Sequence, residues 1–499
     1  MTTPHLQRPA VGFAPATLES RRWLQFRDSR VAAPARARPL HALLLFEKEW
    51  DGGGLAPLVK GGELCLYTEG FDLFRFPDNA RLLTFDAWRF VDRICARYRG
   101  RIGAVLSANE QFGALLAAVI AQRLGLPGAD PAAVCAAHHK LVARGIQHRL
   151  APHATVPSLA LPFELGDPRS HDAQALSDAL TGLGRGFPLF VKPVKATFSV
   201  LARRVDSADE LARHLRFGPF ERLIIERLVR PYAQIAKCLI DMPCDPTRML
   251  LEESVDEHQV NVDGYVFNGE VRVLGLVDAW MYPREAAGAK HFLRFSYPSV
   301  VQGAARERVT ALTRQIVEAI GLRHSFFNCE FFVCRNGDVK FIEMNPRVAA
   351  QFVGMYRDVE GLDGYRMLVD LAAGRDPAAT PRLWRKHGAA ASLVWRKFDG
   401  TTGAMPAPGA LDWLATQLPH ARLAMFHKRG RGLAREYKWL GSHRYAVMNL
   451  SARDERALNA AFERICLRFG WPCEFPDTEA PRSRSFAPVP AEEKITVSA

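Results

Sequence analysis

The chain has 499 residues, 48% of them hydrophobic, and a formal net charge of +13, which is the profile of a globular protein rather than a disordered or fibrous one. No apolar run reaches the roughly 18 residues of a membrane span, and the N-terminus has no signal-peptide segment, so we expect a soluble, cytoplasmic protein with no membrane partner. Its 66 Lys and Arg residues are scattered, which argues against a specific nucleic-acid partner. Nine cysteines form no CxxC pair, so we expect reduced thiols.

The N-terminal third changes character near residue 38. Residues 1–38 hold seven arginines among Ala and Pro and are predicted to be a basic, flexible arm. After them, residues 41–46 and 101–107 read as strands, 51–54 as an Asp-Gly-Gly-Gly turn, and 111–124 as a helix ending at Gly125. This alternation predicts a doubly wound α/β domain over residues 39–130.

The middle of the chain mixes helices with antiparallel hairpins. We expect helices over residues 132–150, 207–216, 306–321 and 364–373, and strands over 187–194 and 199–205. Residues 259–267 and 271–282 flank Asn268-Gly269, a dipeptide typical of a two-residue hairpin turn.

The C-terminal residues remain globular for about ninety positions. Residues 391–397 and 444–450 are predicted strands, and 454–469 is a predicted amphipathic helix. They indicate a small α+β unit over residues 385–475, whose position alone suggests that it selects the acceptor substrate. Residues 476–499 are rich in Pro, Ser, Glu and Arg and are predicted to be a disordered tail.

Residues 326–347 contain the most informative pattern. Asn336-Gly337 is a second two-residue turn signal between β-rich runs, so Arg335 is expected to pair with Asp338. That register puts three pairs opposite each other on one face: Phe332 with Phe341, Glu330 with Glu343, and Asn328 with Asn345.

Two carboxylates placed opposite each other repel unless a proton or cation lies between them. Glu330, Glu343 and the amide of Asn345 are hard oxygen ligands, which suit Mg²⁺ or Mn²⁺ better than zinc. The alternative is that both glutamates face solvent at a sheet edge, and the two phenylalanines on the same face disfavour it. The sequence therefore predicts a divalent metal site on this hairpin.

The segment from Glu330 to Phe341-Ile-Glu-Met-Asn-Pro-Arg347 resembles the metal-binding core of the ATP-grasp superfamily, in particular its carboxylate-amine ligase branch. Other landmarks follow in the family's order: Lys140, Phe190-Val-Lys-Pro193, Leu250-Leu-Glu-Glu253 and the hairpin over 262–271. The resemblance implies a pre-ATP-grasp domain over residues 39–130 and a two-lobed ATP-grasp domain over 131–380.

The same resemblance implies roles for individual residues. ATP would lie between the two lobes, with its adenine near Glu252 and Glu253 and its phosphates held by Lys140 and Lys192. Mg²⁺ would bridge the phosphates to the predicted metal ligands. Arg347 would stabilise the transferring phosphoryl group or the acyl oxyanion, because a guanidinium binds oxyanions bidentately.

Each residue that is predicted to bind the nucleotide has an alternative interpretation. Lys192 could be a surface lysine, and Lys140 could lie on a solvated helix with His138 and His139. Glu226 also follows an apolar run and competes with Glu252 for the place near adenine.

Three departures from the family pattern stand out. The loop after Lys192 has no glycine where many members have a glycine-rich phosphate lid, so Lys195, Thr197 and Ser199 are expected to supply those contacts. Gln259 replaces a ribose-binding glutamate, although its amide can still bond a hydroxyl. Val348-Ala-Ala follows Arg347 in place of a glycine pair and narrows the acyl pocket.

The family implies an enzyme that activates a carboxylate as an acyl phosphate and passes it to an amine, a thiol or another nucleophile, with ADP and phosphate as products. Its partners would be a small-molecule acid and a nucleophile, and homodimer formation is left open. Two alternatives remain: a carboxylase subunit related to biotin carboxylase, and a nucleotide-binding regulatory protein without turnover. The missing glycine-rich lid disfavours the former, and the paired carboxylates disfavour the latter.

Overall fold

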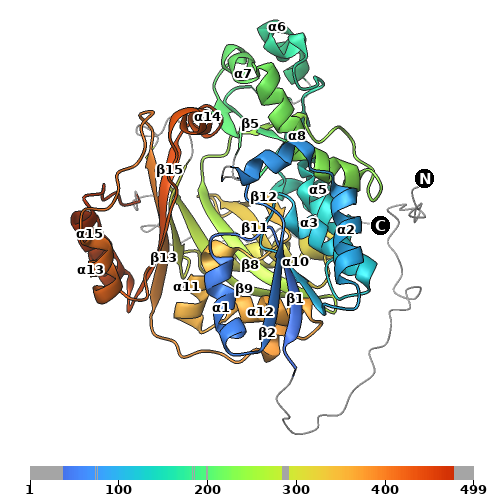
Figure 1. Ribbon diagram of the computed structural model, residues 1–499. Coiled ribbons are helices and arrows are strands. Elements are labelled where there is room, and N and C mark those ends of the chain that lie inside the picture. The colour runs from blue at the N-terminus through green and yellow to red at the C-terminus, as the bar shows by residue number, and fades with distance from the viewer. Residues whose placement is uncertain are drawn as a thin grey trace, which may run out of the picture.

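The computed structural model describes residues 38–73, 75, 77–181, 184, 186–197, 200–283 and 291–476. The predicted arm before Arg38 and the predicted tail after Pro476 lie outside them. The described strands form three sheets: a three-stranded parallel sheet, a four-stranded sheet and an eight-stranded sheet, the last two with antiparallel pairing throughout. The smaller four-stranded lobe lies above the large sheet in the view of Figure 1.

The N-terminal sheet confirms the doubly wound α/β prediction. Its order is β2 (Leu64–Glu69), β1 (Leu40–Leu45), β3 (Ala104–Leu106). Leu43 and Leu45 of β1 pack in one core with α2 (Ala87–Tyr98) and α3 (Gly113–Leu124), and Ala42 and Leu44 pack in another with α1 (Asp51–Lys60). Alternate side chains of a strand point to opposite faces, so helices cover both sides. A 3₁₀ segment, η1 (Asp78–Thr84), precedes α2.

The four-stranded sheet has the order β4 (Ser158–Ala160), β7 (Met249–Glu253), β5 (Leu189–Pro193), β6 (Arg203–Val205). We call it and its helices the small lobe. Its core includes side chains of α6 (Ala173–Leu180), α7 (Ala208–His214) and α8 (Pro219–Ala236), and η3 (Pro168–His171) packs on α6 and α7. Helices α4 (Pro131–His138) and α5 (Lys140–Leu150) and the short η2 (Pro152–Ala154) pack against β12 (Val339–Asn345) of the large sheet.

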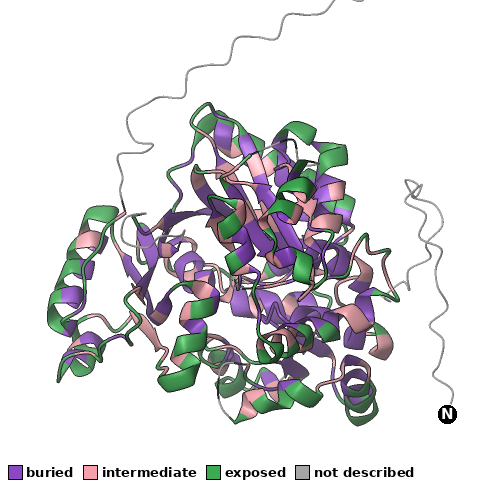
Figure 2. Cartoon of the chain, turned by 90° about the horizontal axis from the view of Figure 1, so that it is seen from above, coloured by how far each residue is buried: buried purple, intermediate pink, exposed green. Residues whose placement is uncertain are grey.

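The large sheet has the order β12 (Val339–Asn345), β11 (Ser325–Val333), β8 (His258–Phe267), β9 (Glu270–Met281), β10 (Phe292–Tyr297), β13 (Ala389–Lys397), β15 (His443–Ala452), β14 (Arg422–Met425). Helix α10 (Gly303–Ile320) packs on β8 and β11, while α11 (Ala350–Glu360) packs on β10, β13 and β15. Next to α11 lie α12 (Gly364–Ala372) and η5 (Pro377–Ala379). Buried residues concentrate in the strands, and the outer faces of the helices are exposed (Figure 2).

The residues of the predicted C-terminal unit extend this large sheet instead of forming a sheet of their own, because β13 pairs with β10. Helices α13 (Ala410–Gln417) and α15 (Glu455–Phe469) pack on the outer face. Helix α14 (Gly430–Leu440) reaches the small lobe, beside β5 in Figure 1. There Trp439 enters the small-lobe core, and its carbonyl accepts from the Leu201 N–H at 3.1 Å.

Two predicted elements differ in the structure. The Asp-Gly-Gly-Gly turn is the first turn of α1, because the buried Asp51 bonds Lys48 N and the Tyr365 hydroxyl, and Gly54 leaves room for the Tyr365 ring. A Cβ on Gly54 would lie 2.1 Å from that ring. The single helix predicted over 132–150 is two helices that break at His139, whose extended backbone starts α5 and whose Nδ1 accepts from Val142 N.

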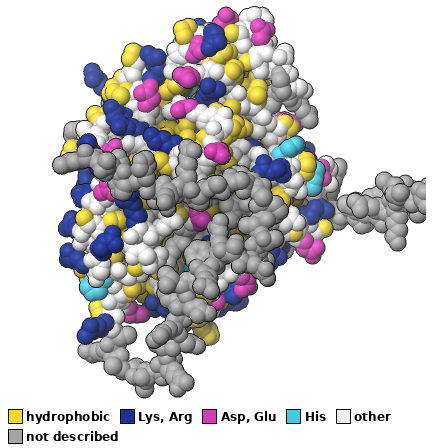
Figure 3. Space-filling model, turned by 90° about the vertical axis from the view of Figure 1, so that its right-hand side faces the viewer, with side chains coloured by type: hydrophobic (Ala, Val, Ile, Leu, Met, Phe, Trp, Pro, Cys, Tyr) yellow, Lys and Arg dark blue, Asp and Glu magenta, His cyan; other side chains and the backbone are white. Residues whose placement is uncertain are grey.

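The charge of the protein is distributed over its surface. On the face in Figure 3, Lys and Arg side chains alternate with Asp and Glu. All nine cysteines are free. Within the described residues, no helix is both long and apolar enough to cross a membrane.

Candidate active site

A solvent-connected cleft of about 890 Å³ separates the small lobe from the large sheet. Strands β5 and β7 of the small lobe form one wall, and β8, β11 and β12 of the large sheet form the other. Its lining includes seven of the nine predicted site residues: Lys140, Lys192, Glu252, Glu253, Gln259, Glu330 and Glu343. Residues as distant in sequence as Lys140 and Glu343 therefore meet around one space.

The hairpin of β11 and β12 brings Glu330 opposite Glu343 and Asn328 opposite Asn345, as the register analysis predicts. The turn itself is different. The carbonyl of Cys334 accepts from Gly337 N, and Cys334 N donates to Asp338 O, so the loop has three residues and ends in Gly337 at φ 86°. The longer loop shifts the register by one residue near the turn.

A β-bulge next to Glu330 shifts the register back. Between the turn and the bulge the shifted register pairs Phe332 with Lys340, so the predicted pairing of Phe332 with Phe341 is wrong. Phe341 instead packs edge-on against Phe331 in the core, with ring centroids 5.0 Å apart. The bulge thus aims Glu343 at the cleft while Phe341, two residues away, is buried on the other side.

The paired carboxylates have different surroundings. Glu330 accepts from Gln259 Nε2 at 2.8 Å and from Asn345 Nδ2 at 3.2 Å. Burial and the neighbouring charge of Glu343 raise the pKa of Glu330 to about 8. Burial also acts on Glu343, but the positive charges of Lys140, Lys192 and Arg144 outweigh it and lower the pKa of Glu343.

These residues fit a divalent cation. Burial and the charge of Glu343 favour a proton on Glu330, and a cation between the two carboxylates relieves the same repulsion. Asn345 Oδ1 stays available while its Nδ2 donates to Asn328 and Glu330. Two carboxylates and an amide oxygen are a hard donor set of the kind that Mg²⁺ uses together with waters and phosphates.

Both predicted phosphate lysines lie in the cleft. Lys192 is 5% exposed and binds Glu252 at 2.7 Å, so it is not the surface lysine of the alternative reading. Lys140 donates to Ala196 O at 2.9 Å and lies 3.5 Å from Glu343 Oε2. Its neighbours His138 and His139 are buried, which excludes the solvated helix.

Glu252 is buried and forms ion pairs with two cationic side chains. Its carboxylate contacts Lys192 and also Arg144, whose Nη2 lies 2.6 Å away. Arg144 also donates to the Phe341 carbonyl at 2.8 Å and so links Glu252 of the small lobe to the β11–β12 hairpin. The competitor Glu226 is exposed on α8. Sequence reasoning missed Arg144, although a single arginine on a buried helix face was a signal that it needed a carboxylate.

Arg347 and Asn345 complete the predicted set at the end of β12. Arg347 Nη2 binds Glu110 Oε2 at 2.6 Å, and its Nη1 is buried with no partner in the described part of the chain. Glu110 was not predicted as a site residue. It follows β3, and ligands of open α/β sheets bind at the carboxyl ends of parallel strands, so a signal for it existed.

The loop after Lys192 makes fixed contacts in place of a glycine-rich lid. Lys195 is buried near the Glu110 carbonyl, and Thr197 Oγ1 donates to Gln111 Oε1 at 2.7 Å. Ser199, the third residue expected there, lies outside the described residues. The described part of this loop is therefore held against the N-terminal domain.

The comparisons agree with this geometry. Residues 185–355 match the model of the ATP-grasp domain family. The chain contains an ATP-grasp domain. No curated protein matches the sequence.

Solved structures extend the likeness beyond the ATP-grasp domain. An L-amino acid ligase from Bacillus licheniformis is 16% identical, with a TM-score of 0.61. The match covers 86% of this chain and 98% of the ligase chain. A carboxyaminoimidazole ribonucleotide synthase from Aspergillus clavatus, complexed with ATP, is 12% identical with a TM-score of 0.58 and the same coverages.

The biotin carboxylase domain of a Hydrogenobacter thermophilus 2-oxoglutarate carboxylase, complexed with MgADP and bicarbonate, is 14% identical with a TM-score of 0.55. The match covers 86% of this chain and 89% of that carboxylase chain. At these identities the likeness shows a common fold, and the fold includes the N-terminal and C-terminal regions.

Proposed function

We propose that this protein is an ATP-dependent ligase that activates a carboxylate as an acyl phosphate and transfers the acyl group to an amine or another nucleophile. The observation that carries the proposal is the opposed pair Glu330 and Glu343, facing Lys140 and Lys192 across one cleft. Such an arrangement binds a divalent cation and a polyphosphate together.

The residues act by position and charge. Lys140 and Lys192 hold the phosphates of ATP, while the 252–255 segment borders the adenine and Gln259 the ribose. Glu330, Glu343 and Asn345 hold Mg²⁺ or Mn²⁺, which neutralises phosphate charge when bound. Arg347, oriented by Glu110, meets the oxyanion that develops at the reacting carboxyl group.

The reaction consists of two transfers. A carboxylate oxygen of the acid attacks the γ-phosphorus of ATP, the bond to the bridging oxygen breaks, and ADP leaves. The nucleophile then attacks the acyl carbon, the bond to the phosphate oxygen breaks, and phosphate leaves as the nucleophile loses its proton. We propose that residues 39–130, 131–380 and 385–475 serve as the three working regions of a cytoplasmic enzyme.

The test is ATP consumption with Mg²⁺ against a panel of amino acids, dipeptides, hydroxy acids and bicarbonate, with ADP and AMP both measured. Acid-dependent ADP and phosphate support the proposal and begin to identify the acid. AMP and pyrophosphate would indicate adenylation and refute it. Turnover with bicarbonate alone would favour the carboxylase reading, and tight MgATP binding without turnover on the panel would favour the regulatory one.

A further inference from the structure

Two arginines lie opposite each other on the C-terminal strands of the large sheet. Arg396 of β13 pairs with Arg444 of β15, just beyond a bulge at Trp395. Residues directly opposite on antiparallel strands have Cβ atoms about 5 Å apart, and like charges there destabilise the sheet. Both side chains are half-buried, so water screens their repulsion only in part.

Neither arginine has a carboxylate partner within 4 Å among the described residues. Arg396 donates Nη1 to Ser442 Oγ at 2.9 Å, while its Nε is buried without a partner. The Arg444 guanidinium lies 4.4 Å from the Phe426 ring centroid and makes no side-chain hydrogen bond in the described part of the chain. Burial, and then the charge of Arg444, lowers the pKa of Arg396 to about 10.

The nearby acidic side chains are occupied elsewhere. Glu436 binds Lys428 at 2.6 Å and His443 at 3.1 Å. Glu49, which faces Arg444 from the N-terminal domain, lies 3.8 Å from Lys48. Glu436 and Glu49 act on the two arginines only at longer range, so in the described part of the chain neither guanidinium group has a carboxylate within 4 Å.

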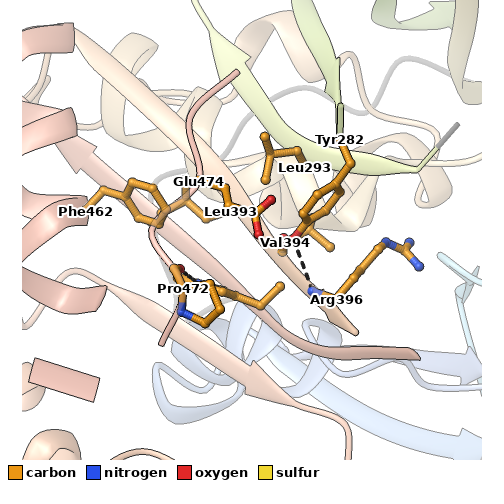
Figure 4. A pocket seen from close by; sticks show the side chains of 9 residues that line it. Tyr282, Leu293, Leu393, Val394, Arg396, Phe462, Pro472 and Glu474 are labelled. Carbon is orange, nitrogen blue, oxygen red and sulfur yellow. Dashed lines mark hydrogen bonds between the residues drawn. The ribbon is translucent and has the colours of Figure 1, made fainter. Parts of the chain in front are cut away.

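The pair lies on the cleft side of the sheet. Arg396 borders a small pocket that Phe462, Pro472 and Glu474 also line, and Figure 4 shows its guanidinium pointing away from that pocket. On its own side, Ser442 Oγ is 3.3 Å from His291 Nδ1, and His291 Nε2 is buried without a partner. His291 precedes Phe292, which lines the nucleotide cleft. Two nitrogens without a partner among the described residues, Arg396 Nε and His291 Nε2, thus belong to side chains that both contact Ser442, and His291 lies one residue before the cleft-lining Phe292.

We propose that Arg396 and Arg444 bind an anionic oxygen group, a carboxylate or a phosphate, of the acid or acceptor substrate. That this anion belongs to a substrate rests on the proposed function. Neighbouring guanidinium groups bind oxyanions through several charge-assisted hydrogen bonds, and a bound anion reduces the repulsion between them. The C-terminal strands then contribute directly to substrate selection.

The experiment measures binding of inorganic phosphate and of malonate by calorimetry, in EDTA and without nucleotide, to the full-length protein. Arg396→Gln and Arg444→Gln should each weaken binding about tenfold or more, because each removes charge-assisted hydrogen bonds. Arg444→Lys should keep part of the affinity. Arg468→Gln, an exposed arginine of α15, is the matched control and should bind as the wild type does.

Lys192→Ala separates this site from the phosphate site of the nucleotide, because anion binding at the arginine pair should survive it. Tighter binding of phosphate would indicate a phosphate monoester as the ligand, and tighter binding of malonate a carboxylate. No binding of either anion at about 10 mM, or equal binding to wild type and both Gln variants, would overturn the proposal. Binding of MgATP to the wild type is measured alongside, and its absence would count against the proposed function alone.

Discussion

The large sheet carries two pairs of like charges placed opposite each other, one acidic and one basic. Glu330 and Glu343 on β11 and β12 have three cations nearby, and Gln259 and Asn345 donate to Glu330. Arg396 and Arg444 on β13 and β15 have one hydroxyl and one aromatic ring. Cations therefore lie close to the acidic pair, whereas neither arginine of the basic pair has a carboxylate within 4 Å in the described part of the chain.

The acidic pair and the basic pair are also expected to have different roles. The acidic pair lies where the reacting phosphates would be, so its loss removes chemistry. The basic pair lies farther along the same sheet, on β13 and β15, so its loss should change which substrate binds. The predictions below begin with the largest expected effect.

Glu343→Gln should reduce kcat by about 1,000-fold or more, because a neutral amide is a poor ligand for a divalent cation that neutralises transition-state charge. The fold should remain intact. ADP production at saturating Mg²⁺ measures the loss, with Glu307→Gln, an exposed glutamate of α10, as the control. Retained activity would contradict the role of the hairpin.

Lys192→Ala should weaken MgATP binding by about 10- to 100-fold, since it removes a buried cation that faces the phosphates and leaves Glu252 with Arg144 alone. Calorimetric titration with MgATP measures the change. Lys60→Ala, at the exposed end of α1, should bind as the wild type does. An unchanged affinity in Lys192→Ala would assign that lysine a purely structural role.

Removal of divalent cations should distinguish ligand binding at the acidic pair from ligand binding at the arginine pair. Stabilisation by ATP, about 2.7 kcal/mol at a hundredfold excess over Kd, should fall sharply in EDTA, because the phosphates then face the acidic pair without a cation. Stabilisation by phosphate or malonate through the arginine pair should persist in EDTA. Thermal unfolding under both conditions measures this, and loss of both effects in EDTA would mean that one metal-dependent site accounts for all binding.

Glu330→Gln should stabilise the metal-free protein by about 1 kcal/mol at neutral pH, because it removes the repulsion between opposed carboxylates. The folded-state pKa of Glu330 is raised from 4.5 to about 8, so its ionisation costs folding free energy as pH rises through that range. The advantage of the glutamine should therefore grow between pH 5 and pH 8 and then level off. Urea unfolding across that range tests it, and an advantage that shrinks with pH would contradict the assignment.

Part of this site could be predicted from the local sequence. Asn336-Gly337 marks a turn between β-rich runs, and the spacing of Glu330 and Glu343 around it predicts their pairing. The pairing holds for a reason that the pattern does not contain: a three-residue loop shifts the register and a bulge shifts it back. The bulge arises where Phe331 and Phe341 pack edge-on in the core, and such packing is a tertiary contact.

Other site contacts have no local signal. Arg347 meets Glu110 across 237 positions, and Arg144 meets Glu252 across 108. Arg396 and Arg444 become neighbours only because β13 and β15 are adjacent in the sheet and a bulge sets their register. A sequence pattern shows that an arginine is present but not which charge it faces.

The sequence by itself determined the doubly wound N-terminal sheet, the opposed Glu330 and Glu343 of the β11–β12 hairpin and the lysines of the cleft, because periodicity, turn residues and short motifs act over a few residues. Tertiary structure alone decided that the C-terminal strands join the large sheet, that α14 inserts Trp439 into the small lobe, and that two arginines oppose each other. The reason is physical: strand order and the pairing of buried charges depend on which distant segments exclude water together, and that is fixed only when the chain has packed.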